Sequence, residues 1–223
     1  MKRIKLKDRV LPCYSKGEEI MNMVTHISGG GISILLTLLC FWKILPNGQV
    51  MAIVGCSVYC LSMITVYCIS GIYHGLHVST GKKVMQVIDH CMIYFLIAGT
   101  YTPILLIGFV PAIPTIGWGL LGCQWLLAAI AITLTAIDLK RFQIFSMLCY
   151  ILMGWAIIFF LPIALKCLTY DGFILLLSGG IAYTLGAILF GIGVKVKWMH
   201  SVFHIFVVIG SVLQFFAIYL YLL

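Results

Sequence analysis

The sequence is poor in charged residues. Only 9% of its 223 residues are Asp, Glu, Lys or Arg, and six residues are acidic, whereas soluble domains carry about 25% charged residues. Hydrophobic residues make up 63% of the chain, and the mean hydropathy is +1.15. Because so little polar surface is available to cover a soluble fold, the sequence predicts an integral membrane protein.

Two features of other protein classes are also missing. The nine cysteines include no C-x-x-C pair, and most of them lie inside apolar segments. This pattern favours small apolar core residues over a disulfide framework or a cysteine zinc site. The net charge of +8 does not indicate nucleic-acid binding, because the basic residues cluster in short segments and do not alternate with aromatic residues.

Apolar runs of about 20 residues, the length that crosses a bilayer, dominate the rest of the chain. There are seven of them, at 22–42, 50–73, 88–108, 112–136, 142–164, 172–193 and 202–222. The sequence therefore predicts an all-α bundle of seven transmembrane helices, with a basic tail over 1–20 and one membrane domain over 21–223. The first run is too long for a signal-peptide core, so it is interpreted as a span. Pro103 predicts a kink in the third run.

The distribution of basic residues predicts the orientation of the bundle. Only Lys43 and Lys166 lie in the odd-numbered loops. The tail and the even-numbered loops carry the other twelve: Lys2, Arg3, Lys5, Lys7, Arg9, Lys16, Lys82, Lys83, Lys140, Arg141, Lys195 and Lys197. Because cytoplasmic loops are enriched in Lys and Arg, we expect a cytoplasmic N-terminus and a C-terminus outside. All six histidines and Asp89 then lie on the cytoplasmic side.

His200 and His204 begin the last apolar run, four residues apart. On a helix their rings project from one face, a common way to offer two imidazoles to one metal ion. The alternative is an interfacial pair, since polar aromatic residues are frequent at the headgroup level. The intervening residues lack the Glu of H-E-x-x-H, which disfavours a zincin-type protease.

Ser70 and His74 repeat this spacing at the end of the second run. His74 is a candidate third ligand, which would leave a fourth position open, as catalytic zinc requires. An interfacial role is the alternative for His74. For Ser70 the alternative is a hydroxyl bonded back to its own helix.

Asp89 begins the third apolar run. It could simply favour the positive end of the helix dipole. Ionisable groups at membrane depth are costly, however, and usually face a partner or an aqueous cavity, so near a metal Asp89 could accept a proton from water or orient it. Glu19, Asn22 and His26 are candidate supporting groups, and His77 and His90 are weaker candidates.

The combined pattern resembles the hemolysin III family, which belongs to the progestin and adiponectin receptor group. That group is part of a wider set of membrane hydrolases that includes alkaline ceramidases. The residues that carry the resemblance are Ser70-x-x-x-His74, Asp89, His200-x-x-x-His204, Glu19-x-x-Asn22-x-x-Thr25-His26 and the run from Asp89-His90 to Gly99-Thr100-Tyr101-Thr102-Pro103. The last two are similar to the bacterial branch, so a bacterial inner membrane is the expected location.

The resemblance implies a zinc ion held by His74, His200 and His204. Asp89 would contact the water on that zinc, and Ser70 would support the site. Eukaryotic relatives are linked to ceramide hydrolysis, which is attack on a lipid amide. Three imidazoles also suit copper, nickel or iron, so the preference for zinc depends on the resemblance and the ligand type.

Three classes of function remain open on this sequence. The first is a metal-dependent hydrolase of lipid amides or esters, whose substrate enters from the inner leaflet. The second is a cytolytic pore, which the family name favours but which the absence of a regular polar stripe disfavours. The third is a receptor-like or membrane-homeostasis protein with a structural metal, for which Asp89 could supply the fourth ligand. A retinal protein is disfavoured, because the last run has no lysine to form a Schiff base. A transporter is also disfavoured, because the centres of the spans carry no ionisable group.

Overall fold

The computed structural model describes residues 6–223, and all regular structure within that range is helical. The α-helices are α1 (Lys16–Ile44), α2 (Val50–Gly75), α3 (Thr80–Pro103), α4 (Val110–Ala112), α5 (Pro114–Ile137), α6 (Gln143–Trp155), α7 (Leu161–Gly193) and α8 (Met199–Tyr221). Shorter helical turns are η1 (Leu6–Asp8), η2 (Leu45–Asn47), η3 (Ile104–Phe109) and η4 (Ala156–Phe160). Six segments within the described range are long and apolar enough to cross a membrane. The prediction of an all-α membrane protein is therefore confirmed.

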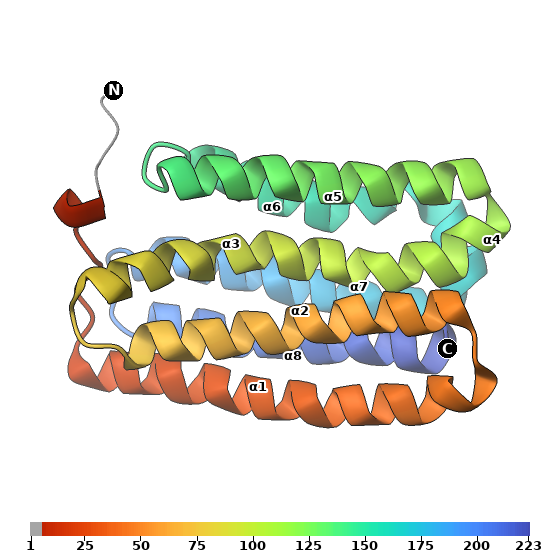
Figure 1. Cartoon of the computed structure of the whole chain (residues 1–223), viewed down its shortest axis with the longest axis horizontal. Helices are drawn as coiled ribbons and strands as arrows, with labels where there is room; N and C mark the ends of the chain where they lie inside the picture. The colour runs from red at the N-terminus through yellow and green to blue at the C-terminus, as the bar shows by residue number, and fades with distance from the viewer. Residues whose placement is uncertain (1–5) are drawn as a thin grey trace.

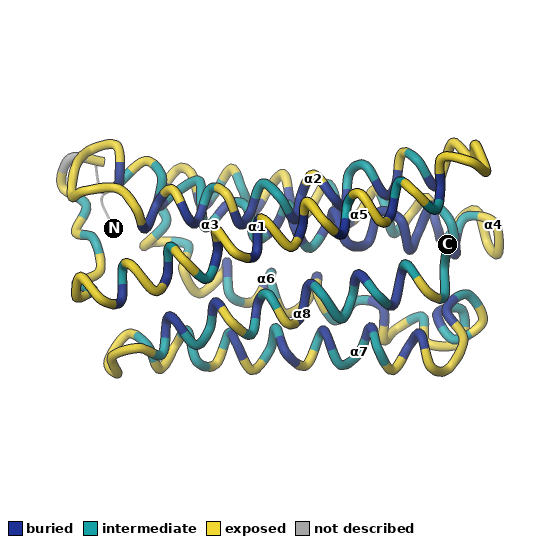
Figure 2. Tube along the Cα trace, turned by 90° about the horizontal axis from the view of Figure 1, so that it is seen from below, coloured by how far each residue is buried: buried dark blue, intermediate teal, exposed yellow. Residues whose placement is uncertain are grey.

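The long helices lie side by side along one axis (Figure 1). α1 packs against α2 and α8, α2 also packs against α3, and α7 packs along α8. Buried stretches of the chain face the other helices, and exposed stretches face outward (Figure 2). Large apolar side chains such as Leu38, Trp42 and Phe159 are exposed on the outside, as a lipid-facing surface requires. The start of α1 and the C-terminus lie at opposite ends of the bundle (Figure 1).

Helix α3 begins earlier than the predicted third span. Its N-cap is Ser79, whose hydroxyl accepts a hydrogen bond from the backbone N–H of Lys82. Hydropathy marks only the apolar part of a helix, whereas a capping hydroxyl marks its true start. Asp89 consequently lies well inside the helix. Because the dipole effect falls off within the first turn, interpreting Asp89 as a helix-dipole partner is wrong.

The segment from Gln143 to Gly193 breaks inside the predicted loop at 166–171, where two helices meet across a kink. It is helical throughout this loop except at Thr169, which has φ 61° and ψ 174°, an unfavourable conformation for a β-branched residue. Its 51 residues would extend about 75 Å as one straight helix, more than twice the thickness of a bilayer core. In Figure 1 α6 and α7 run in opposite directions, so the chain reverses within this segment.

Pro103, where the sequence predicts a kink, is followed by π-helical turns over Ile104–Phe109. Proline has no N–H to donate and its ring displaces the preceding turn, so regular α-helical hydrogen bonding cannot continue through it. Gly55 of α2 lies directly against this point, where an added Cβ would come within 2.9 Å of Pro103 Cα. The small residue therefore lets α2 and α3 approach closely.

The contact between α7 and α8 gives a test of the packing. An added Cβ on Gly179 would lie 2.5 Å from Gln214 Cγ and 2.9 Å from the carbonyl oxygen of Gly210, whereas one on Gly180 would meet nothing within 4 Å. We expect Gly179→Ala to destabilise the protein by about 1–3 kcal/mol through overpacking, and Gly180→Ala to be neutral or slightly stabilising. Thermal unfolding of both variants in detergent checks this. Equal melting temperatures for the two variants would contradict the observed packing.

Candidate metal centre

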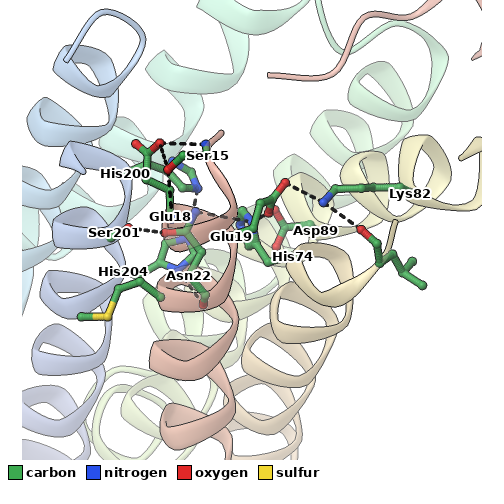
Figure 3. Close-up of polar contacts among 12 residues, drawn as sticks. Ser15, Glu18, Glu19, Asn22, His74, Lys82, Asp89, His200, Ser201 and His204 are labelled. Atoms are coloured by element: carbon green, nitrogen blue, oxygen red, sulfur yellow. Dashed lines mark hydrogen bonds and ion pairs between the residues drawn. The ribbon is translucent and has the colours of Figure 1, made fainter. Parts of the chain in front are cut away.

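Three imidazole rings meet at the end of the bundle where α1 begins (Figures 1 and 3). His74 comes from the last turn of α2, and His200 and His204 come from the first two turns of α8. All three are buried. One ligand nitrogen from each lies within 4.8 Å of the others, and the Nε2 atoms of His200 and His204 are 3.1 Å apart. The structure thus brings together the three histidines that the sequence analysis selected.

The donor set fits a metal ion. Nε2 of His74 is buried and has no hydrogen-bond partner among residues 6–223. A hydrogen bond between His200 and His204 would leave Nε2 of His74 unpaired, whereas one metal ion would satisfy all three rings. In a tetrahedral site with zinc–nitrogen bonds of about 2.0–2.1 Å, ligand nitrogens lie roughly 3.3 Å apart. The observed spacing of His200 and His204 is close to this value.

Glu19 of α1 orients His74. Its Oε2 lies 2.7 Å from Nδ1 of His74, and its Oε1 accepts a hydrogen bond of 2.6 Å from Nζ of Lys82. A carboxylate on Nδ1 fixes the tautomer in which the lone pair is on Nε2, the arrangement common behind metal-binding histidines. Lys82 is itself buried and also donates to the carbonyl of Leu76 at 3.0 Å. The ion pair between Glu19 and Lys82 thus links the start of α3 to His74.

Asn22 of α1 supports the α8 side of the site. Its backbone carbonyl lies 3.3 Å from Nδ1 of His204, and its side-chain Oδ1 accepts a hydrogen bond of 2.6 Å from Ser201. The Thr25 hydroxyl lies 3.4 Å from the same His204 nitrogen. A donor role for Nδ1 leaves Nε2 of His204 free to bind a metal. One face of α1 thus positions ligands from both α2 and α8.

Glu18 fixes the beginning of α8. It is not among the site residues that the sequence predicts. Its Oε1 accepts a hydrogen bond of 2.8 Å from the backbone N–H of Trp198, the N-cap residue of α8, which has φ 68°. Its other oxygen accepts from the N–H and hydroxyl of Ser15. The Ser-x-x-Glu spacing is a capping-box signature, so a sequence signal for Glu18 existed. Its contact with α8 depends on the tertiary fold.

Tyr14 covers the histidines from the N-terminal segment. Its ring stacks on His200 with centroids 5.0 Å apart and lies 5.8 Å from His74. Burial raises the pKa of the Tyr14 hydroxyl, and the carboxylates of Glu19 and Asp89 raise it further. The phenol therefore stays neutral at physiological pH. No sequence pattern indicates this contact, because Tyr14 precedes the first helix.

Asp89 and Ser70 occupy less direct positions. Asp89 lies on α3 in the region of Glu19 and His74 (Figure 3), and its Oδ2 is 3.6 Å from Nδ1 of His90. Ser70 is buried one turn before His74. Within the described range, neither residue hydrogen-bonds the three imidazoles, which instead contact Glu19, Asn22, Thr25 and one another.

Comparison with known proteins places this arrangement in a family. Residues 14–215 match the family described as "Haemolysin-III related". The chain belongs to the hemolysin III family. It is 40% identical to Hemolysin-3 of Bacillus cereus over 206 residues, which cover 92% of each chain. It is 38% identical to the Hemolysin-3 homolog of Bacillus subtilis over 92% of this chain and 94% of the relative.

A more distant similarity extends to animals. The human monocyte to macrophage differentiation factor is 25% identical over 173 residues, which cover 74% of this chain and 69% of that protein. No solved structure matches the chain. The resemblance inferred from the sequence motifs is therefore confirmed at the level of the family.

Proposed function

We propose that this protein is a metal-dependent membrane hydrolase that cleaves amide or ester bonds of lipids. The observation that carries the proposal is the convergence of His74, His200 and His204, with Nε2 of His74 buried and unpaired. Zinc is the preferred ion, because among residues 6–223 the group of possible ligands contains three histidines and no further residue, as is typical of catalytic zinc sites. The hydrogen bonds from Glu19 and Asn22 support this reading, since they orient the rings as metal ligands require.

The surrounding residues have separate roles in such a reaction. His74, His200 and His204 would hold the zinc ion, which when bound would lower the pKa of water to about 7 and so supply a nucleophile at neutral pH. Asp89 accepts the proton of the attacking water and returns it to the leaving amine or alcohol. Ser70, one turn from His74, supports the site, and Tyr14 shields the histidines from bulk water.

The proposed topology has seven crossings with the N-terminus in the cytoplasm. The segment from Gln143 to Gly193 would cross twice, since the chain reverses within it (Figure 1). The segments before α1, between α2 and α3, between α5 and α6, and between α7 and α8 lie at the histidine end of the bundle (Figure 1). These segments and the helix starts beside them contain most of the described basic residues: Arg9, Lys16, Lys82, Lys83, Lys140, Arg141, Lys195 and Lys197. By the positive-inside rule this end faces the cytoplasm. The site would then take lipids from the inner leaflet of the plasma membrane, a bacterial one by similarity to the Bacillus relatives.

Lipid turnover by the purified protein tests this function. We expect the metal-loaded wild type to hydrolyse members of a panel of N-acyl amides and acyl esters. Asp89→Ala should lower the rate at least about 100-fold, the contribution of a general base, with its metal content unchanged. Asp171→Ala is the matched control, because Asp171 is exposed and lies on α7.

Two results would contradict the proposal. Full activity in Asp89→Ala would remove the assigned role of that residue. Absence of turnover across the panel, together with dye release from liposomes that persists in His200→Ala/His204→Ala, would favour the cytolytic alternative.

A further inference from the structure

His26 of α1 is a second histidine without a partner. Its ring is buried, and neither Nδ1 nor Nε2 has a hydrogen-bond partner among residues 6–223. A neutral imidazole carries one donor and one acceptor, and buried polar groups in native proteins are nearly always paired. Something outside the described chain should therefore satisfy this ring.

His26 lies directly beside the three-histidine metal site. Its ring stacks on His204 with centroids 3.6 Å apart and planes within 14°, and it meets the ring of Tyr67 edge-on at 5.3 Å. His26 is not part of the group of nitrogens within 4.8 Å that could hold a metal. A metal ion would satisfy Nε2 of His74 and leave His26 unpaired. The site therefore needs a second polar occupant beside the metal.

The neighbours of His26 limit the chemistry of this occupant. A buried water molecule needs two to four polar partners. The hydroxyl of Tyr67 already donates to Ser211 and lies 3.2 Å from the carbonyl of Val207, and His204 presents its ring face. An acyl carbonyl has an apolar chain and requires few polar partners, so it suits this environment better.

We propose that His26 binds the substrate, donating a hydrogen bond to the carbonyl oxygen of its amide or ester group. This inference rests on the proposed hydrolase function and names a residue that selects for an acyl carbonyl. The imidazole acts as a neutral donor. Its stacking on His204 holds it beside the metal site. Recognition of the carbonyl and binding of the metal would then occur on adjacent rings.

Binding of dodecanohydroxamic acid to the metal-loaded full chain in detergent tests this inference by calorimetry, without turnover. The probe is an acyl hydroxamate, whose carbonyl oxygen takes part in metal binding and can also accept a hydrogen bond. His26→Phe keeps an aromatic ring against His204 and removes both nitrogens. We expect its Kd for the probe to rise roughly tenfold or more, which corresponds to at least about 1.4 kcal/mol, while its metal content stays at the wild-type level.

Two further variants make the result specific. His26→Gln, which keeps an N–H donor, should bind the probe better than His26→Phe and serves if the latter does not fold. Tyr67→Phe removes only the hydroxyl of the neighbouring ring and leaves both nitrogens of His26 in place. This variant should bind the probe like the wild type.

Each contrary result has a separate meaning. Equal probe affinity in the wild type and His26→Phe would overturn the role of His26 and leave the hydrolase proposal intact. Loss of metal in His26→Phe would also overturn it, since His26 would then hold the metal site together. Failure of the metal-loaded wild type to bind the probe would overturn the hydrolase proposal, and the inference with it.

Discussion

The purified wild-type protein is expected to carry about one metal ion per chain, and the His200→Ala/His204→Ala variant none. The double substitution removes two of three converging imidazoles. Loss of residues that merely orient a ligand lowers metal affinity by about 10–100-fold, so loss of two ligands should lower it much further. Elemental mass spectrometry of detergent-purified protein, normalised to chain concentration, measures the content directly.

His77→Ala is the matched control for this experiment. His77 is exposed in the loop between α2 and α3, only three residues after His74. A histidine-to-alanine substitution there also removes an imidazole from the chain but leaves the three-histidine site unchanged. Size-exclusion and circular dichroism profiles establish that the double variant is folded. Metal-free but folded wild type, or a double variant that retains the ion, would remove the metal from the proposed function.

The candidate ligands were accessible from the sequence for two physical reasons. The spacing of His200 and His204 defines one helix face locally, whatever the rest of the fold does. His74 could be added because the charge distribution predicts that the end of the second run and the start of the last run lie on the same side. Neither argument reaches the 3.1 Å separation of Nε2 atoms, which depends on how α1 packs between α2 and α8.

Contacts between distant polar residues were beyond sequence reasoning. Lys82 was interpreted as a topology signal, yet it is buried and paired with Glu19, 63 residues away. Tyr14 cannot be assigned to the site from the sequence, because nothing in the segment before α1 indicates which helix it covers. Helix limits were missed for a different reason. Hydropathy reports the solvent preference of side chains, whereas the start of α3 is set by the hydroxyl of Ser79 bonding a backbone N–H.

Removal of Glu19 is expected to weaken the metal site and the fold together. Glu19→Ala leaves Nδ1 of His74 without its carboxylate and leaves the ammonium of Lys82 buried without its counter-charge. We expect metal affinity to fall about 10–100-fold. Breaking a fully buried ion pair costs about 3–5 kcal/mol, and because the Glu19 side chain is 22% exposed, about 2–3 kcal/mol of unfolding free energy is expected here. Metal titration and thermal unfolding in detergent measure the two effects.

Substitution of Lys82 separates these two effects. Lys82→Met removes the buried charge and leaves the contact of Glu19 with His74 in place, so its metal affinity should remain near the wild-type value. In Glu19→Gln/Lys82→Met no buried charge is left unpaired, and the amide oxygen of the new Gln can still accept from Nδ1 of His74. That variant should recover most of the stability lost in Glu19→Ala. Wild-type metal affinity in Glu19→Ala would mean that the carboxylate serves only Lys82 and that packing alone orients His74.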